Sequence, residues 1–282
     1  VLFGAETYML VNGSTGGILS AVSAALRKGE TLLMARNCHK AAYHAAYLNE
    51  CRVEYVYPDF LEAYGICGEI SPESICKKLD EIPDIRAIFL TSPTYDGVVS
   101  DITKIVQKAH KKKIPVIVDA AHGAHFGIDS RFPKSAIECG ADIVIHSIHK
   151  TLPALTQTAL LHVQGELIDR RRLERFLQIY QTSSPSYILM AGIEQCISIL
   201  ETQRKELCDG FFKQNLLFEQ KIEKLQCIRV FSTKSAGKVV YDFDIGKKII
   251  SARGTGMTGK ELYTVLLEKY GLQMGIHLRK LW

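Results

Sequence analysis

The sequence predicts an α/β fold, with a mostly parallel seven-stranded sheet covered by helices on both faces, then long helices and an incomplete small α+β domain. Three observations predict this class. Short apolar runs of strand length alternate with amphipathic segments of helix length as far as Val163. Long helical segments follow, and a shorter mixed remainder begins at Cys227. The 282 residues, 47% of them hydrophobic, suffice for one large core and part of a second unit.

Seven apolar runs of strand length are predicted to form the sheet. Continuous apolar runs are typical of parallel strands, because helices cover both faces of a parallel sheet. The runs span residues 7–11, 31–35, 53–57, 87–90, 116–118, 143–145 and 159–163.

Helical segments separate these runs and dominate the chain after the last of them. We expect helices over residues 16–27, 40–49, 72–79, 102–112, 134–139, 166–181, 185–226 and 258–269, and a further strand at residues 270–274. This pattern divides the chain into a large domain over residues 1–190, a linking helix over 191–226 and a partial small domain over 227–282.

The composition excludes several classes of protein. The formal net charge of +5 is spread along the chain, so we expect no nucleic-acid partner. No apolar run reaches the roughly 20 residues of a membrane span, and no signal peptide precedes the first strand, so we expect no membrane association. The 8 cysteines form no Cys-x-x-Cys pair, which argues for reduced thiols, a cytoplasmic location and no metal site.

The first motif that could carry chemistry is Asn-Gly-Ser-Thr-Gly-Gly at residues 12–17, between a predicted strand and a predicted helix. Backbone amides and hydroxyl groups at the start of a helix favour an anion such as a phosphate. Ser and Thr are also common helix N-caps, and glycine is common in tight turns. Taken alone, this motif leaves both interpretations open.

A carboxylate stands at the end of a predicted buried strand, at Asp119. An ionised carboxylate there needs a cation or hydrogen-bond donors, and a protonated pyridine nitrogen would be such a cation. A helix N-cap and a magnesium ligand are the alternatives. His122, three residues further on, could support Asp119 through a hydrogen bond or cap the following turn.

The most specific motif is Ser-Ile-His-Lys at residues 147–150, which directly follows a predicted strand. Burial beside a core strand lowers the pKa of a lysine, and a neutral amine is what Schiff-base formation requires. The alternative is a structural Lys150 that extends along the sheet with its ammonium group in solvent.

Together these motifs resemble the pyridoxal-phosphate (PLP) dependent aspartate-aminotransferase superfamily of fold type I, and within it the Orn/Lys/Arg decarboxylases. The resemblance rests on Ser-x-His-Lys at 147–150, Asp-x-Ala at 119–121 and Asn-Gly-Ser-Thr at 12–15, in the family order. Arg-Asn-Cys-His-Lys at 36–40 points to the decarboxylase branch. The resemblance covers residues 1–274 and implies a PLP-dependent transferase-like major domain within residues 1–190. Ala120 departs from the Glu that many relatives in this branch carry.

The resemblance also implies a role for each matching residue. Lys150 would hold PLP as an internal aldimine, and Asp119 would pair with the pyridinium nitrogen. His39 would stack on one face of the ring, and Ala121 would pack against the other. Phosphate ligands would come from Ser14, Thr15 and Ser147, with His149 beside the phosphate and the lysine. Thr94, in the loop 91–97, and His122 are further candidates.

The activity that the resemblance implies is decarboxylation of lysine, arginine or ornithine to the amine and CO₂, in a homodimer or higher homo-oligomer. The alternatives are another fold-type-I enzyme, such as a lyase, an aldolase or an aminotransferase, and a truncated PLP-fold protein without catalysis. A nucleotide-binding α/β protein is disfavoured because neither GxGxxG nor GxxxxGK[ST] is present. The chain starts at Val1 and lacks the strands that the family has after Met274, so we expect either that the natural protein is longer or that this copy is a broken one.

Overall fold

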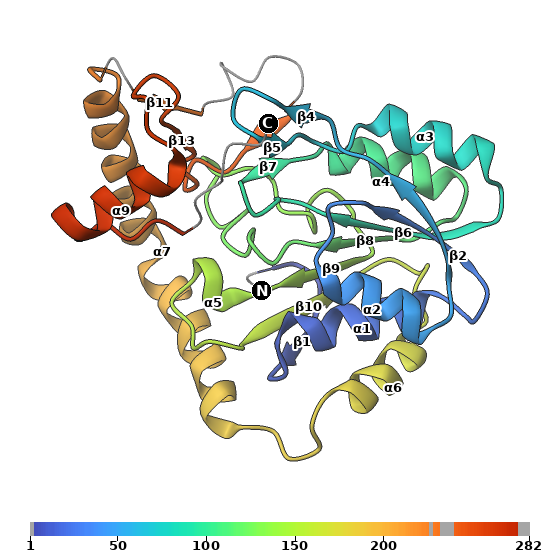
Figure 1. Ribbon diagram of the computed structural model, residues 1–282. Helices are drawn as coiled ribbons and strands as arrows, with labels where there is room; N and C mark the ends of the chain where they lie inside the picture. Colours follow the sequence, from blue (N-terminus) through green and yellow to red (C-terminus); the bar gives the residue numbers. More distant parts are fainter. Residues whose placement is uncertain (1–2, 226–227, 232–239, 276–282) are drawn as a thin grey trace.

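A computed structural model describes residues 3–225, 228–231 and 240–275 (Figure 1). Its centre is a seven-stranded sheet in the order β1 (Glu6–Leu10), β10 (Ala159–Val163), β9 (Ile143–His146), β8 (Val116–Asp119), β6 (Ile85–Thr91), β2 (Thr31–Ala35) and β3 (Arg52–Val56). Strand β10 is antiparallel to both of its neighbours, and the pairs from β9 to β3 are parallel. The predicted sheet is therefore confirmed in strand number and in its mostly parallel order.

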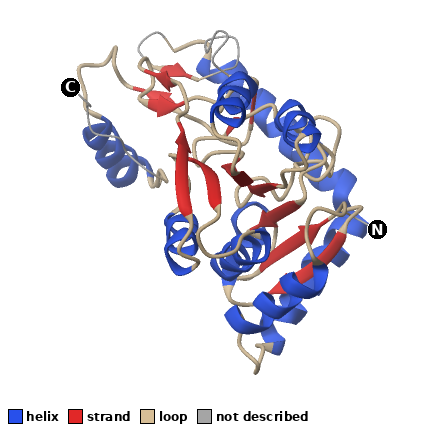
Figure 2. Ribbon diagram, turned by 90° about the vertical axis from the view of Figure 1, so that its right-hand side faces the viewer, coloured by secondary structure: helices blue, strands red, loops and turns tan. Residues whose placement is uncertain are grey.

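Helices cover both faces of this sheet, as the alternating pattern predicts (Figure 2). One face packs against α1 (Gly13–Ala25), α2 (Lys40–Leu48) and α6 (Arg170–Tyr180). The other packs against α3 (Pro72–Glu81) and α4 (Ile102–Lys111). The long helix α7 (Tyr187–Ile222) packs over β10 and α5 (Ile148–Thr151).

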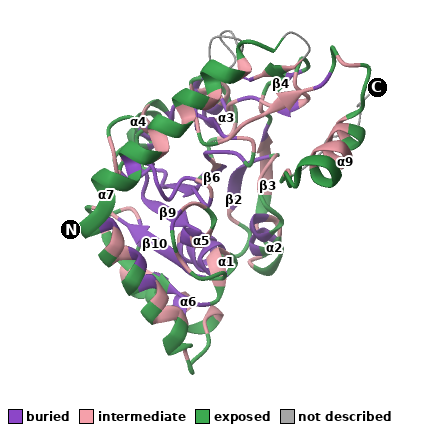
Figure 3. Ribbon diagram, turned by 90° about the vertical axis from the view of Figure 1, so that its left-hand side faces the viewer, coloured by how far each residue is buried: buried purple, intermediate pink, exposed green. Residues whose placement is uncertain are grey.

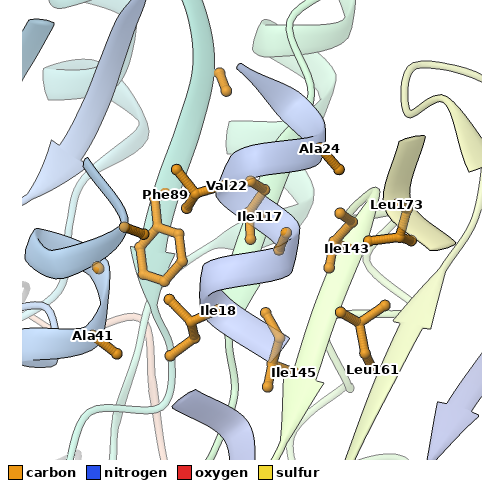
Figure 4. Close-up of a cluster of buried hydrophobic side chains, with 14 of the residues drawn as sticks. Ile18, Val22, Ala24, Ala41, Phe89, Ile117, Ile143, Ile145, Leu161 and Leu173 are labelled. Atoms are coloured by element: carbon orange, nitrogen blue, oxygen red, sulfur yellow. The ribbon is translucent and has the colours of Figure 1, made fainter. Parts of the chain in front are cut away.

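The hydrophobic core has two halves, one on each face of the sheet, because successive side chains of a strand point to opposite faces. Along β2, Leu32 and Met34 belong to one core cluster and Leu33 to the cluster on the opposite face. Figure 4 shows the first cluster, in which Ile18 and Val22 of α1 face side chains of the central strands. The central strands are accordingly buried throughout, between helices whose outer faces are exposed (Figure 3).

Beyond α7 the chain returns to the large domain. Strand β12 (Asp242–Phe243) pairs with β7 (Val98–Val99), which follows β6, and β11 (Arg229–Val230) pairs with β13 (Ile250–Ser251). A further hairpin joins β4 (Phe60–Leu61) to β5 (Ile66–Cys67), and α9 (Gly259–Tyr270) ends the described chain. Parts of the small domain predicted at 227–282, namely residues 227, 232–239 and 276–282, lie outside the described residues.

The helix predicted at residues 134–139 is wrong. These residues form a turn in which Ser135 and Glu138 bond each other's backbone amides, at 2.9 and 3.2 Å. Gly140 follows with a φ of 89° and the chain enters β9 shortly after, so there is room for a single turn only.

The strand predicted at residues 270–274 is also wrong. Tyr270 is the last residue of α9, and Gly271 ends the helix in the left-handed region with a φ of 64°. The amides of Gly271 and Leu272 bond carbonyls of the last helical turn, which is a common way to end a helix. Residues 272–275, the last that the structure describes, form no strand. No helix in the described part of the chain is long and apolar enough to cross a membrane.

Candidate functional site

The residues singled out in the sequence lie at one edge of the sheet. Parallel strands β2, β6, β8 and β9 end there, and the carboxyl ends of such strands are where ligands bind in open α/β sheets. Asp119 is the last residue of β8, and Ser147 directly follows β9. Lys150 comes one helical turn later, in α5.

Asp119 is almost fully buried, with 3% of its surface exposed. Its Oδ1 accepts a hydrogen bond of 3.1 Å from the amide of Ala121. Its other oxygen has no hydrogen-bond partner among the described residues and is not sealed from solvent, so it borders space that solvent can reach. Burial raises the pKa of Asp119 to about 6, although the Ala121 amide and the charge of Lys150 lower it. A cation placed in that space would pair with this carboxylate.

Lys150 is an exposed residue overall, but its amine is directed to a protein partner. Its Nζ lies 3.1 Å from Nε2 of His122. Desolvation lowers the pKa of Lys150, the carboxylate of Asp119 raises it, and the charge of Lys247 lowers it. The amine of Lys150 and the carboxylate of Asp119 therefore lie close enough for their charges to interact.

His122 has other partners than the sequence suggested. The expectation was a hydrogen bond to Asp119, but Nε2 faces Lys150 and Nδ1 lies 3.4 Å from Nζ of Lys247. Both ring nitrogens are thus engaged, and none is left for Asp119. Burial, together with the charges of the two lysines, lowers the pKa of His122 to about 3. The ring of His122 is neutral at physiological pH.

The predicted phosphate ligands lie where the start of α1 meets the end of β9. The Oγ of buried Ser147 donates a hydrogen bond of 2.7 Å to Oγ of Ser14. Exposed Thr15 is in the same first turn of α1, and the N-cap residue Asn12 makes no side-chain hydrogen bond to that turn. The free amides, the helix dipole and the hydroxyl groups together suit an anion.

Most of the remaining predicted residues make local hydrogen bonds or are buried. His39 is the N-cap of α2, where its Nδ1 accepts a hydrogen bond of 3.2 Å from the amide of Ala41. His149 donates from Nδ1 to the carbonyl of Thr158, at 2.9 Å, because a carbonyl can only accept. Ala121 is buried directly after Asp119.

Thr94 is also buried, and its Oγ1 accepts a hydrogen bond of 3.1 Å from the amide of Val98. That hydroxyl closes the loop between β6 and β7, and its proton remains available to a ligand.

Sequence reasoning missed Lys247 and Tyr95. Lys247 follows β12, so the pairing of β12 with β7 brings it to the edge where Lys150 lies. Its Nζ lies 5.1 Å from the centre of the Tyr95 ring, which also contacts His122 edge-on with ring centres 5.2 Å apart. Strands of two residues leave no periodic pattern, so no signal in the sequence could have placed Lys247 here.

The chain is similar to proteins that have been curated or solved. It is 31% identical over 274 residues to an arginine decarboxylase of Bacillus subtilis, covering 96% of this chain and 56% of that protein. It is 43% identical over 191 residues to the uncharacterized protein YaaO of the same species, covering 67% of this chain and 40% of that protein. The crystal structure of the lysine decarboxylase LdcF of Francisella novicida superposes with a TM-score of 0.78 at 21% identity, over 98% of this chain and 45% of that one.

The fold is that of the PLP-dependent transferases. The sequence profile of the Orn/Lys/Arg decarboxylase major domain matches residues 1–249. The chain therefore belongs to the Orn/Lys/Arg decarboxylase family. It spans about half the length of the curated relatives named above, 40% and 56%.

Proposed function

We propose that this chain supplies the cofactor-binding part of a PLP-dependent enzyme that decarboxylates a basic amino acid. The observation that carries the proposal is the pair formed by Lys150 and Asp119, an amine and a buried carboxylate whose charges interact at the carboxyl edge of the sheet. Membership in the family and the similarity to an arginine decarboxylase support it.

The residues present fit this cofactor. Lys150 would hold it covalently through its amine. Asp119 is largely ionised above pH 6 and would keep a ring nitrogen protonated from its free oxygen. Ser14, Thr15 and Ser147 would bind its phosphate at the uncapped start of α1. When bound, PLP supplies an electron sink for the carbanion that remains after CO₂ leaves.

His39, Ala121, Thr94 and His149 would complete the pocket. His39 would cover one face of the ring from the start of α2, and Ala121 the other from the turn after Asp119. Thr94 and His149 would offer a hydroxyl and an imidazole to bound groups. Excluding water from this space would keep the interaction of Asp119 with its cation strong.

The choice among lysine, arginine and ornithine depends on groups that bind the far end of the substrate.

We propose that the boundaries 1–190, 191–226 and 227–282 divide the chain into cofactor domain, linking helix and small domain. We further propose that a homodimer or higher oligomer completes the pocket in the cytoplasm.

The proposal is tested by supplying the PLP-loaded protein with lysine, arginine and ornithine in turn and following CO₂, amine and keto acid separately. A decarboxylase releases CO₂ and amine in equal amounts from at least one of the three. Release of keto acid without CO₂ would point to an aminotransferase. Bound cofactor without any product would contradict the proposal.

A further inference from the structure

The imidazole of His122 lies between two lysine side chains from distant parts of the chain. Its Nε2 is 3.1 Å from Nζ of Lys150, and its Nδ1 is 3.4 Å from Nζ of Lys247. Lys150 is in α5, after β9, and Lys247 follows β12. The two lysines therefore meet one ring from opposite sides.

Hydrogen-bond chemistry restricts how these three groups can be protonated. A neutral imidazole has one N–H donor and one acceptor nitrogen, whereas a lysine ammonium group can only donate. If both lysines were charged, one of them would face the N–H of the ring with no acceptor. Both contacts can be hydrogen bonds only when one of the two lysines is a neutral amine.

The carboxylates around the site decide which lysine stays charged. Burial lowers the pKa of Lys247, but two carboxylates, those of Asp244 and Asp96, raise it and so favour its ammonium form. Lys150 interacts with one, Asp119, whose Oδ1 already accepts a hydrogen bond from the amide of Ala121. A protonated ring nitrogen paired with Asp119 would also cancel that charge for Lys150. Lys247 is thus the charged donor, and Lys150 is the neutral acceptor.

The fold holds Lys247 in this position. Gly97 has a φ of 100°, and a Cβ atom there would lie 2.8 Å from both Cβ and Cγ of Lys247. The carbonyl of Gly97 accepts a hydrogen bond of 2.8 Å from the amide of Asp244, which extends the pairing of β12 with β7. The ring of Tyr95 contacts both Lys247 and His122. Any side chain at position 97 would therefore clash with Cβ and Cγ of Lys247, so its present position requires a glycine there.

We propose that Lys247 and His122 act as a relay that holds Lys150 as a free amine. In this relay the ammonium group of Lys247 donates to Nδ1 of His122, and the Nε2–H of His122 donates to the lone pair of Lys150. Both are positioning residues, and the inference rests on the proposed function, because a free amine at Lys150 is what attacks the aldehyde of PLP. Desolvation and the charge of Lys247 lower the pKa of Lys150, in agreement with this state.

Other charged and titratable groups face the relay from several elements, and they are part of the expected pH dependence. They are Asp119 at the end of β8, His39 at the start of α2, His149 in α5, Asp96 and Tyr95 between β6 and β7, and Asp244 after β12.

Competitive labelling of the cofactor-free protein with acetic anhydride measures the relay directly, because only neutral amines react. The extent of labelling of the Lys150 peptide is followed by mass spectrometry as a function of pH. Lys247→Met removes the charge and the donor, so labelling of Lys150 at neutral pH is expected to fall severalfold and its pH profile to move to higher pH. His122→Phe is expected to act in the same direction, because it removes the N–H that a neutral amine accepts.

Two variants serve as controls. Lys247→Arg keeps a charged donor and should restore most of the wild-type profile. Lys248→Met makes the same change one residue later, where Nζ lies 3.2 Å from Glu219 of α7, and should leave Lys150 unaffected. An unchanged Lys150 profile in Lys247→Met, or an equal shift in Lys248→Met, would overturn the inference.

The labelling experiment contains no cofactor, so its outcome is separate from that of the proposed function. If PLP attaches to Lys150 but Lys247→Met leaves its labelling unchanged, the relay alone is wrong. If PLP does not attach to Lys150, the proposed function is wrong whatever the labelling shows.

Discussion

The carboxylate of Asp119 lies where it destabilises the fold in the absence of a ligand. A carboxylate that is 3% exposed and has one amide donor is poorly solvated, which is why burial raises its pKa from 3.8 to about 6. Such groups are typical of binding sites, where the missing partner arrives with the ligand. The cofactor-free site is therefore expected to reduce the stability of the fold.

This cost gives a prediction for Asp119→Asn. Because the folded pKa is above the unfolded one, the stability linked to Asp119 is present below pH 3.8 and is lost as pH rises through about 6. Two pKa units correspond to roughly 3 kcal/mol as an upper bound. The cofactor-free variant should therefore be more stable than the wild type at pH 8, by roughly 2 kcal/mol, and this advantage should vanish toward pH 4.

Urea unfolding at both pH values measures this difference, and Asp80→Asn is the matched control. Asp80 is an exposed carboxylate that pairs with Lys112 at the surface, and such pairs contribute little. A variant Asp119→Asn that is less stable than the wild type at pH 8 would show that the carboxylate is satisfied without a ligand.

At the scale of helices and strands, two glycines of α7 show how packing decides whether a change to alanine stabilises the protein. Gly210 lies on an exposed part of the helix, and a Cβ atom there would meet nothing within 4 Å. Gly192 lies on the same helix, but its Cβ would come within 2.9 Å of Cδ1 and 3.1 Å of Cγ of Leu155, in the loop after α5.

We predict that Gly210→Ala stabilises the protein by about 1 kcal/mol, because alanine is the better helix former. Gly192→Ala gains the same helix propensity, but the contact with Leu155 opposes it by roughly 1–3 kcal/mol. Thermal or urea unfolding of the two variants should therefore place Gly192→Ala at least about 1 kcal/mol below Gly210→Ala. Equal stabilisation by both substitutions would mean that the loop around Leu155 yields freely.

The elements of the large domain could be predicted because each carries its own signal. Strands β2, β8, β9 and β10 are buried on both faces and therefore read as mostly apolar runs. The turn at residues 134–139 has the composition of a helix but only the length of one turn before Gly140. Strands β4, β5, β7 and β11–β13 have two residues each, too few for any period to be detected.

For the whole molecule, one part of the candidate site follows from local sequence signals, and another part depends on how distant segments pair in the fold. Asp119 ends β8, Ser147 directly follows β9 and Lys150 comes one helical turn later, so the parallel sheet alone brings them to one edge. Lys247 reaches that edge only because the chain after α7 returns and β12 pairs with β7. Contacts set by such a return depend on the tertiary fold and leave no trace in local sequence.

The attachment of PLP to Lys150 is the claim on which the proposed function depends. Borohydride reduction of the PLP-loaded protein, followed by peptide mapping, tests it directly. We predict a single pyridoxyl group, on the peptide that contains Lys150. A pyridoxyl group on Lys247 or on any other lysine, or none at all, would contradict the account.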